Sequence, residues 1–332
     1  WRNKASGIVI NIGPYINEIG QDVIDFANEK GFPVFRVPWK IHMAEIMRII
    51  CFAITKEQQN TIEVTAALNN AFLCPGQEEL YVSALMRKGY FAGSEYTVVN
   101  IRVKEEDSQV TGVRLDQIAS TLNSHLRCNY NGILCCAQEK QILMVLCDYS
   151  FEMCQETVGR IFDKLCSMIH RNEQVFVSVS KPVDGIRQIH KSYEFGEKMA
   201  ELLCASRVPG EVKTDSGKLL LYKNLGIYKV LLTLTDKDAV LEYIKDTVLP
   251  LYDYDKMNHT DLVKVLRCYL ENDCSVKETA QELIVHRNTV NYKIGKVSEI
   301  LKKDLSGFDI RFQLNLGFLL YQMYEEDIDG RL

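Results

Sequence analysis

Apolar residues in the first 38 positions fall into two short runs that flank one amphipathic segment. The runs cover residues 7–12, which end at Gly13-Pro14, and residues 33–38. Between them, apolar residues recur at steps of three and four, as in a helix, up to Gly31. This strand, helix, strand order predicts part of an α/β domain. Residues 42–73 continue with a helical pattern that Pro75-Gly76 breaks, and we expect a connecting or dimerising helical segment there.

The middle of the chain alternates between strand and helix periodicity. Strands are predicted at 96–103, 132–136, 142–146 and 175–179, and helices at 115–126, 151–169 and 186–203. The strands 132–136 and 142–146 form a hairpin around residues 138–140. The order β-α-β-β-α-β, followed by a helix, is the split βαβ plan, with helices packed on one sheet.

Only helical periodicity is found after Leu225. Helices are predicted at 224–235, 237–248, 260–272, 276–283, 287–301 and 310–324. The last hundred residues therefore form an all-α module. The fold class expected for the whole chain is multidomain α/β + α.

Composition narrows the class of protein. The 332 residues are 47% hydrophobic with a net charge of −5, which suits packed domains and excludes general disorder. No apolar run approaches the roughly 18 residues of a membrane span. The eleven cysteines are odd in number and none are spaced C-x-x-C. We therefore expect reduced thiols in a cytoplasmic protein without metal or cofactor, the alternative being a metal or redox site.

Residues 275–303 have the pattern of a helix-turn-helix. Ser275 and Glu278 are spaced as a capping box, and Ala280 is small where two helices would cross. In the second helix Val290, Ile294, Val297 and Leu301 recur at helical steps and form the inward face. At 100° per residue, the polar side chains of residues 288, 291, 292 and 296 lie roughly 100° to 240° away from Val290 and face outward.

Outward asparagines and cations suit DNA, because Asn pairs with adenine edges and Lys or Arg meets guanine or phosphate. Residues 286–303 contain five cations and one carboxylate, a charge of +4 within an acidic chain. A solvated surface helix is the alternative. We predict contacts with base or groove edges by Arg287, Asn288, Asn291 and Tyr292, and contacts with phosphates by Lys293, Lys296 and Lys302.

The segment Val285-His286-Arg287-Asn288-Thr289-Val290-Asn291-Tyr292-Lys293-Ile294 resembles the signature of the PucR/CdaR family of bacterial transcriptional regulators. The resemblance continues at 254–255, 260–270 and 314–318. Residues 179–180, 192–198 and 222–228 are similar to the GGDEF-like middle domain of these regulators, and residues 7–54 to the second half of their N-terminal sensory domain. The resemblance implies a partial α/β ligand-sensing domain at residues 1–56, and the first half of this domain is expected to be missing. A helical linker at 57–79, a degenerate GGDEF-like domain at 80–222 and a helical domain at 223–332 would follow.

The middle domain lacks the carboxylates that active nucleotide cyclases use to bind two metal ions. Its hairpin turn reads Gln138-Glu139-Lys140-Gln141, and the first strand offers Asn100 and Arg102. We therefore expect no catalysis. A metal-dependent nucleotide cyclase or hydrolase remains the alternative from another class, together with a dimerisation adaptor that does not bind DNA.

Asn11, Gly13 and Tyr15 follow the first predicted strand, where open α/β sheets often bind ligands, although a simple turn explains them as well. The resemblance implies a small-molecule effector of the purine catabolite, sugar acid or amino acid class. The expected protein is thus a cytoplasmic regulator that binds double-stranded DNA as a homodimer or higher homo-oligomer and has no contact with membranes.

Overall fold

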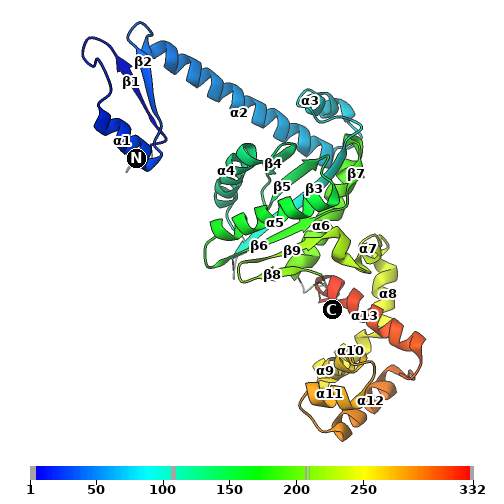
Figure 1. The fold of residues 1–332 in the computed structure, drawn as a ribbon. Helices are drawn as coiled ribbons and strands as arrows, with labels where there is room; N and C mark the ends of the chain where they lie inside the picture. The colour runs from blue at the N-terminus through cyan, green and yellow to red at the C-terminus, as the bar shows by residue number, and fades with distance from the viewer. Residues whose placement is uncertain (1–4, 106–109, 206–207, 209, 330–332) are drawn as a thin grey trace. The chain divides into compact units, whose positions relative to one another are not determined.

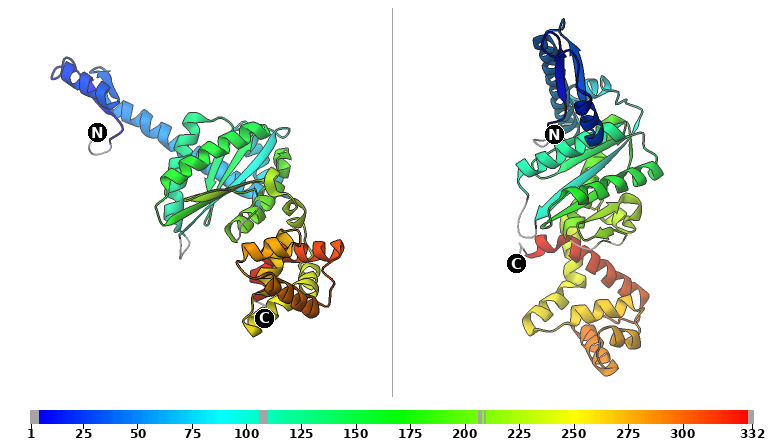
Figure 2. Two further views of the ribbon diagram at one scale, coloured as in Figure 1. Left: turned by 60° about the horizontal axis from the view of Figure 1, so that its bottom comes forward. Right: turned by 60° about the vertical axis from the view of Figure 1, so that its left-hand side comes forward.

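A computed structural model describes residues 5–105, 110–205, 208 and 210–329, and the chain divides into two compact units, residues 1–89 and 90–332. Figures 1 and 2 show their elements. Within the described ranges, no helix is both long and apolar enough to cross a membrane.

The first unit begins with the predicted strand, helix, strand arrangement. Its elements are β1 (Ile8–Ile12), α1 (Gln21–Lys30) and β2 (Val34–Pro38). β1 and β2 pair in parallel, with Ile8 opposite Val34. Gly31 ends α1 in the left-handed region, as expected for a C-terminal cap.

The helical segment that follows is one helix of 31 residues, α2 (Met43–Leu73). It is followed by η1 (Glu78–Leu80) and α3 (Val82–Met86). The boundary expected between residues 56 and 57 falls inside α2, so no break in the backbone marks it. The division into four parts therefore stays a prediction.

The second unit contains the split βαβ sheet, which confirms the predicted order. Its first elements are β3 (Glu95–Glu105), α4 (Gly112–Asn129), β4 (Ile133–Ala137), β5 (Ile142–Cys147), α5 (Phe151–Met168), β6 (Glu173–Val179), β7 (Val183–Asp184), η2 (Ile186–Gln188) and α6 (Ile189–Ala205). β3 is central and pairs antiparallel with both β5 and β6. Helices α4 and α5 share one hydrophobic core with one face of the sheet, and α6 contributes to a second core.

Three strands were not predicted: the two-residue β7, which pairs with β3, and two longer strands, β8 (Val212–Thr214) and β9 (Gly217–Leu221). β8 and β9 extend the sheet to the order β4-β5-β3-β6-β9-β8, and β9 runs parallel to β6. Strands buried on both faces read as continuous apolar runs, so residues 219–221 lack the alternation that identified the other strands.

The helix expected at 224–235 is wrong in extent. The structure has a 3₁₀ turn, η3 (Tyr222–Leu225), and a short helix, α7 (Tyr228–Leu231), on either side of Gly226, whose φ is 55°. The domain boundary expected between residues 222 and 223 falls within the first two residues of η3. One hydrophobic core continues across it, from Phe176 to Ile328.

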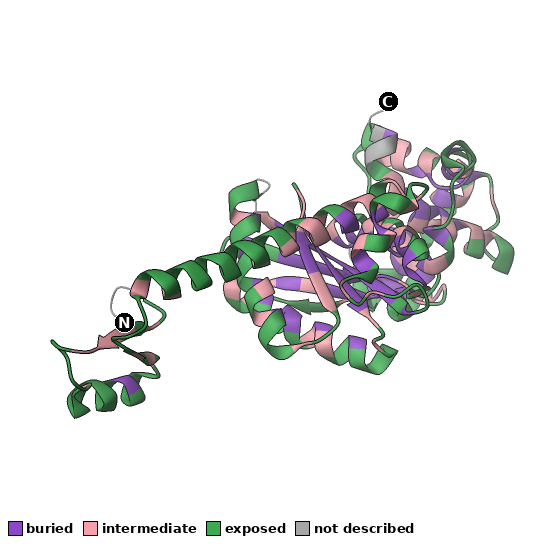
Figure 3. Cartoon of the chain, turned by 90° about the horizontal axis from the view of Figure 1, so that it is seen from above, coloured by how far each residue is buried: buried purple, intermediate pink, exposed green. Residues whose placement is uncertain are grey.

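The remaining helices are α8 (Lys237–Thr247), α9 (Leu249–Asn258), α10 (Leu262–Glu271), α11 (Val276–Glu282), α12 (Arg287–Leu301) and α13 (Phe308–Asp329). Of these, only α9 was not predicted. α8 packs directly on α13, and a Cβ at Gly317 of α13 would lie 2.6 Å from Thr247 Oγ1 of α8. Helices α9 to α12 are therefore an insertion in sequence between two paired helices. Figure 3 shows the buried residues within the elements.

Candidate nucleic-acid interface

The first helix of the predicted helix-turn-helix begins at Ser275. Its Oγ accepts the backbone N–H of Glu278 at 3.4 Å, which confirms the N-cap. The reciprocal half of the capping box does not form, because the Ser275 N–H donates to the carbonyl of Asn272 at 2.8 Å. Ala280 is buried between Val265 of α10 and Val290 of α12, so its small side chain lies where the three helices meet.

The turn between α11 and α12 contains an unusual backbone conformation. Ile284 has a φ of 56°, which is unfavourable for a β-branched residue, and its side chain is 91% exposed. The next N–H, of Val285, donates to the carbonyl of Ala280 at 3.0 Å and closes the turn. His286 then caps α12, with its Nδ1 accepting the N–H of Asn288 at 3.2 Å.

The inward and outward faces of α12 agree with the predicted phase. Val290 and Val297 are fully buried, Leu301 is buried and Ile294 is half-buried. On the opposite side the exposed residues are Arg287, Asn288, Asn291 and Tyr292. Three of the four residues predicted to face outward, Asn288, Asn291 and Tyr292, are therefore exposed, whereas the fourth, Lys296, is half-buried.

A groove of about 1090 Å³ lies along α11 and the start of α12. Arg287, Asn288 and Asn291 line it, so the structure brings three of the predicted residues together. It also adds Lys277, Gln281 and His286, which the sequence reasoning did not select. Lys277 and Gln281 are four residues apart on α11 and so share one helix face, a signal that was present in the sequence.

The three lysines predicted to contact phosphates, Lys293, Lys296 and Lys302, differ from one another in their surroundings. Lys293 forms an ion pair with Asp261, and Lys296 with Glu299 at 3.0 Å. The hydrogen bond that Lys296 donates to the Glu299 carboxylate raises the pKa of Lys296. Lys302 is exposed in the left-handed region after α12, about 22 Å along the axis from Arg287. The charge of +4 already counts Glu299, and Asp261 from outside the segment lowers it further, so two of the five cations are paired. Arg287 is the cation at the start of the helix.

In the sheet domain, a buried polar network surrounds Asn100, one of the two residues that the sequence analysis noted on the first strand. Asn100 is fully buried and donates to the Glu197 carboxylate, which also accepts Gln141 Nε2 at 2.6 Å and pairs with Arg102 at 3.2 Å. Gly196 makes room for this contact, since a Cβ there would lie 2.2 Å from Asn100 Oδ1. Three donors therefore already hold this carboxylate. Across the part of the chain that the structure describes, no group of three or more potential metal ligands is found.

The three predicted effector residues lie at and after the end of β1. Gly13 and Tyr15 both approach Trp39, a residue that the sequence analysis did not select. A Cβ at Gly13 would lie 2.6 Å from the Trp39 indole, and the Tyr15 ring meets the Trp39 ring edge-on, with 6.0 Å between the ring centroids. Asn11 Oδ1 is buried, with no hydrogen-bond partner among the described residues. Their role in binding a ligand stays a prediction.

Two segments of the chain match known families. Residues 262–320 match the PucR C-terminal helix-turn-helix domain, and residues 1–54 match the purine catabolism regulatory protein-like family. The first of these ranges contains α10 to α12 and the start of the paired helix α13.

Three curated proteins of Bacillus subtilis (strain 168) are similar to the chain. The proline-responsive transcriptional activator PutR is 26% identical over 92% of this chain and 71% of its own length. The DNA-binding transcriptional activator AdeR is 23% identical over 74% of this chain and 56% of its own length. The purine catabolism regulatory protein is 39% identical over 62 residues, which are 19% of this chain and 12% of that protein.

Among solved structures, the chain is similar to the regulator of polyketide synthase expression from Bifidobacterium adolescentis. The match has 15% sequence identity and a TM-score of 0.36, and it covers 79% of this chain and 93% of the other.

Proposed function

We propose that the chain is a sequence-specific DNA-binding regulator of transcription. It contains a PucR C-terminal helix-turn-helix domain at residues 262–320 and a PucR-family segment at residues 1–54. Its effector would be a small metabolite of the purine catabolite, sugar acid or amino acid class. The names of the relatives, one proline-responsive and one regulating purine catabolism, support this range of effectors. Assembly into a homodimer or higher homo-oligomer, and a location in the cytoplasm with the DNA, belong to the same proposal.

The observation that supports DNA binding best is the exposed polar face of α12. Asn288 and Asn291 present carboxamides beside the guanidinium of Arg287, on a helix whose opposite side is anchored in the core. A major groove about 12 Å wide admits a helix, and these side chains match the donor and acceptor patterns of base edges. The groove next to α11 adds Lys277 and Gln281 on the same side.

A titration of operator DNA tests the assignment. Fragments bound by the full chain would be selected from the source genome, and affinities then measured by fluorescence anisotropy at one fixed salt concentration. Each lost base contact should cost roughly 1–3 kcal/mol, so we expect the Asn288→Ala/Asn291→Ala variant to bind its operator at least about 30-fold more weakly and to lose sequence preference.

The matched control is Asn129→Ala/Gln155→Ala, which removes two exposed amides from α4 and α5 of the sheet domain. It should bind as the parent chain does. Unchanged operator affinity and preference in the α12 variant would overturn the recognition-helix assignment. Binding that does not weaken as salt rises would instead overturn DNA binding through phosphates.

The middle domain is proposed to relay or assemble rather than to catalyse. The Glu197 carboxylate is engaged by Asn100, Gln141 and Arg102, which supports this role. Magnesium-dependent turnover of GTP by the full chain, abolished by Glu197→Gln, would contradict it.

A further inference from the structure

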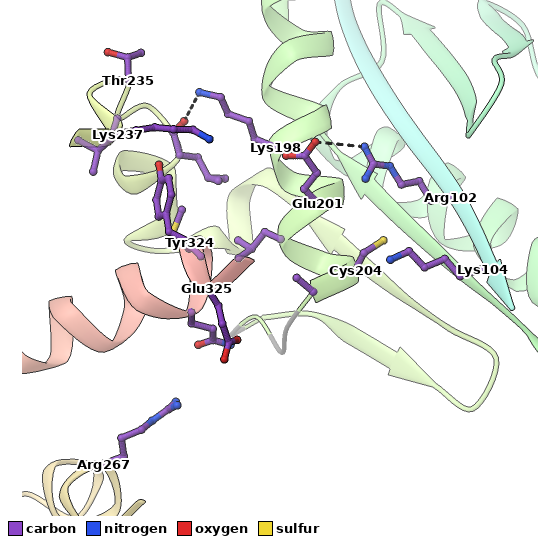
Figure 4. A pocket seen from close by; sticks show the side chains of 16 residues that line it. Arg102, Lys104, Lys198, Glu201, Cys204, Thr235, Lys237, Arg267, Tyr324 and Glu325 are labelled. Atoms are coloured by element: carbon purple, nitrogen blue, oxygen red, sulfur yellow. Dashed lines mark hydrogen bonds and ion pairs between the residues drawn. The ribbon is translucent and has the colours of Figure 1, made fainter. Parts of the chain in front are cut away.

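A cleft of about 990 Å³ lies between the sheet domain and the helices that follow it, all within the second unit (Figure 4). β3, α6, the start of α8, α10 and the end of α13 contribute side chains to it. None of the sequence predictions or comparisons assigns a role to this cleft.

Cations outnumber carboxylates on the described lining of the cleft. The five cations are Arg102, Lys104, Lys198, Lys237 and Arg267, and the two carboxylates are Glu201 and Glu325. Five like charges that line one hollow repel one another and attract anions, so this excess favours an anionic ligand.

Three of the five cations, Lys104, Lys198 and Arg267, contact neutral groups that do not compensate their charge. Arg102 pairs with carboxylates, including Glu201 at 4.0 Å. Lys198 Nζ instead donates to the carbonyl of Leu232 at 2.8 Å, which is a neutral acceptor. Lys104 lies over the Phe176 ring and Arg267 over the Phe318 ring, at 6.0 and 5.7 Å from the ring centroids. An aromatic ring attracts a cation without cancelling its charge.

The rest of the lining is apolar or aromatic. Leu202, Leu232, Leu234 and Met323 contribute aliphatic and thioether surface, and Tyr324 contributes a ring. Tyr324 departs from helical geometry, with φ −122° and ψ 18°, so α13 is kinked at the cleft. In Figure 4 Tyr324 and Lys237 lie at one end of the cleft and Arg102 and Lys104 at the other. The Lys237 ammonium lies 5.9 Å from the centre of the Tyr324 ring.

We propose that this cleft binds a nucleotide, with its phosphates held by the cations and its base placed against Tyr324 and the aliphatic side chains. The volume is in the range of small-ligand sites, and the mixed lining suits a ligand with a polyanionic part and a flat, weakly polar part. Charge-assisted contacts of Lys and Arg with phosphate oxygens provide the attraction. This ligand differs from the metabolite effector proposed for the N-terminal segment, and its binding does not depend on DNA binding.

The test measures binding to the full chain by isothermal titration calorimetry at fixed salt. The probes are GTP, ATP, inorganic pyrophosphate and uncharged adenosine. We expect at least one triphosphate to bind with a dissociation constant below about 1 mM and at least about tenfold more tightly than pyrophosphate, with no detectable binding of adenosine.

Three variants locate the site. Lys104→Gln/Lys237→Gln should weaken binding of the triphosphate by about tenfold or more, because one cation that attracts the polyanion is lost at each end of the cleft. Lys140→Gln/Lys164→Gln removes the same charge from exposed positions at the hairpin turn and on α5, and should change binding by less than about twofold. Glu201→Gln removes a carboxylate from the lining and should tighten binding, an effect that loss of folding cannot produce.

Three results would overturn the proposal. The first is no binding of either triphosphate below about 1 mM. The second is equal affinity for pyrophosphate and the triphosphates, which would assign the cleft to inorganic anions. The third is equal weakening by the two lysine pairs, which would show attraction to the overall charge of the protein rather than to this cleft.

Discussion

Asp255 holds the first turn of α10 from outside that helix. Its Oδ1 accepts the N–H of Leu262 at 2.9 Å, its Oδ2 accepts the N–H of Val263 at 2.8 Å, and the Thr260 hydroxyl also donates to it. The carboxylate on α9 therefore serves as the cap that Asp261, at the N-cap position, does not provide with its own side chain. α10 in turn packs on α11 and α12, so this cap supports the proposed recognition helix α12.

Replacing Asp255 by Ala removes two hydrogen bonds from backbone N–H groups to a charged acceptor. Loss of a helix cap costs about 0.5–2 kcal/mol, and hydrogen bonds to charged groups contribute about 1.5–3 kcal/mol each when isolated. Since water can solvate part of this half-buried site, we expect Asp255→Ala to lower the free energy of unfolding of the helical module by about 2–3 kcal/mol. Asp255→Asn retains one acceptor oxygen and should lose about half as much.

Amide hydrogen exchange measures the effect at the helix itself. A loss of 2–3 kcal/mol corresponds to about a 30- to 160-fold increase in the local opening constant, read as faster exchange at Leu262 and Val263. The control is Asp253→Ala on the same helix, for which the described residues show no hydrogen bond to the side chain; it should change exchange less than about twofold. Equal effects of the two variants, or unchanged protection in Asp255→Ala, would refute the capping argument.

Three further perturbations test other features of the fold. Arg114 holds the pKa of the buried Glu173 carboxyl below its usual value. The ionised carboxylate therefore stabilises the fold above its ordinary pKa, and this stabilisation is lost as the pH falls through the lowered pKa. Glu173→Gln should accordingly flatten the acid side of a plot of urea midpoint against pH. Ile284→Gly should raise the free energy of unfolding by about 0.5–1 kcal/mol in urea titrations, because relief of the positive φ exceeds the added entropy of the unfolded chain, whereas Ile284→Ala keeps the strain and should give no such gain. Gly196→Ala should destabilise the sheet domain by about 1–3 kcal/mol in thermal melts, since its Cβ would collide with Asn100, and a variant as stable as the parent would contradict the close contact.

Local patterns predicted the features that depend on neighbours in sequence. The spacing of Val290 and Val297 gave the correct inward face of α12, because helical periodicity alone decides which side chains face the core. The order of elements from β3 to β6 along the chain was equally accessible, since alternation and turn signals mark these elements. Strand β9 was missed because its run at 219–221 is short, continuous and buried, and such a run does not distinguish strand from helix.

Contacts between distant residues were beyond the reach of these patterns. The charge count around α12 overstated the cations open to DNA, because Asp261, 32 residues before Lys293, becomes its partner only in the folded module. Glu197 could not be connected with Asn100 from the sequence, since α6 has to pack on β3 before the two side chains meet. The cationic cleft could not be predicted for the same reason, because its lining residues come from distant positions between 102 and 325.

The pairing of α8 with α13 determines how helices α9 to α12 are attached. The chain leaves the paired helices after Thr247 and returns to them at Phe308, so α9 to α12 are joined to the rest of the unit by two covalent connections. A module on one flexible linker can swivel in all directions, but one fastened at two neighbouring points is restricted to rocking about the line that joins them. The same double attachment means that a protease cut within 259–261 would leave both fragments anchored to one core, so the nicked protein should migrate as a single species under native conditions.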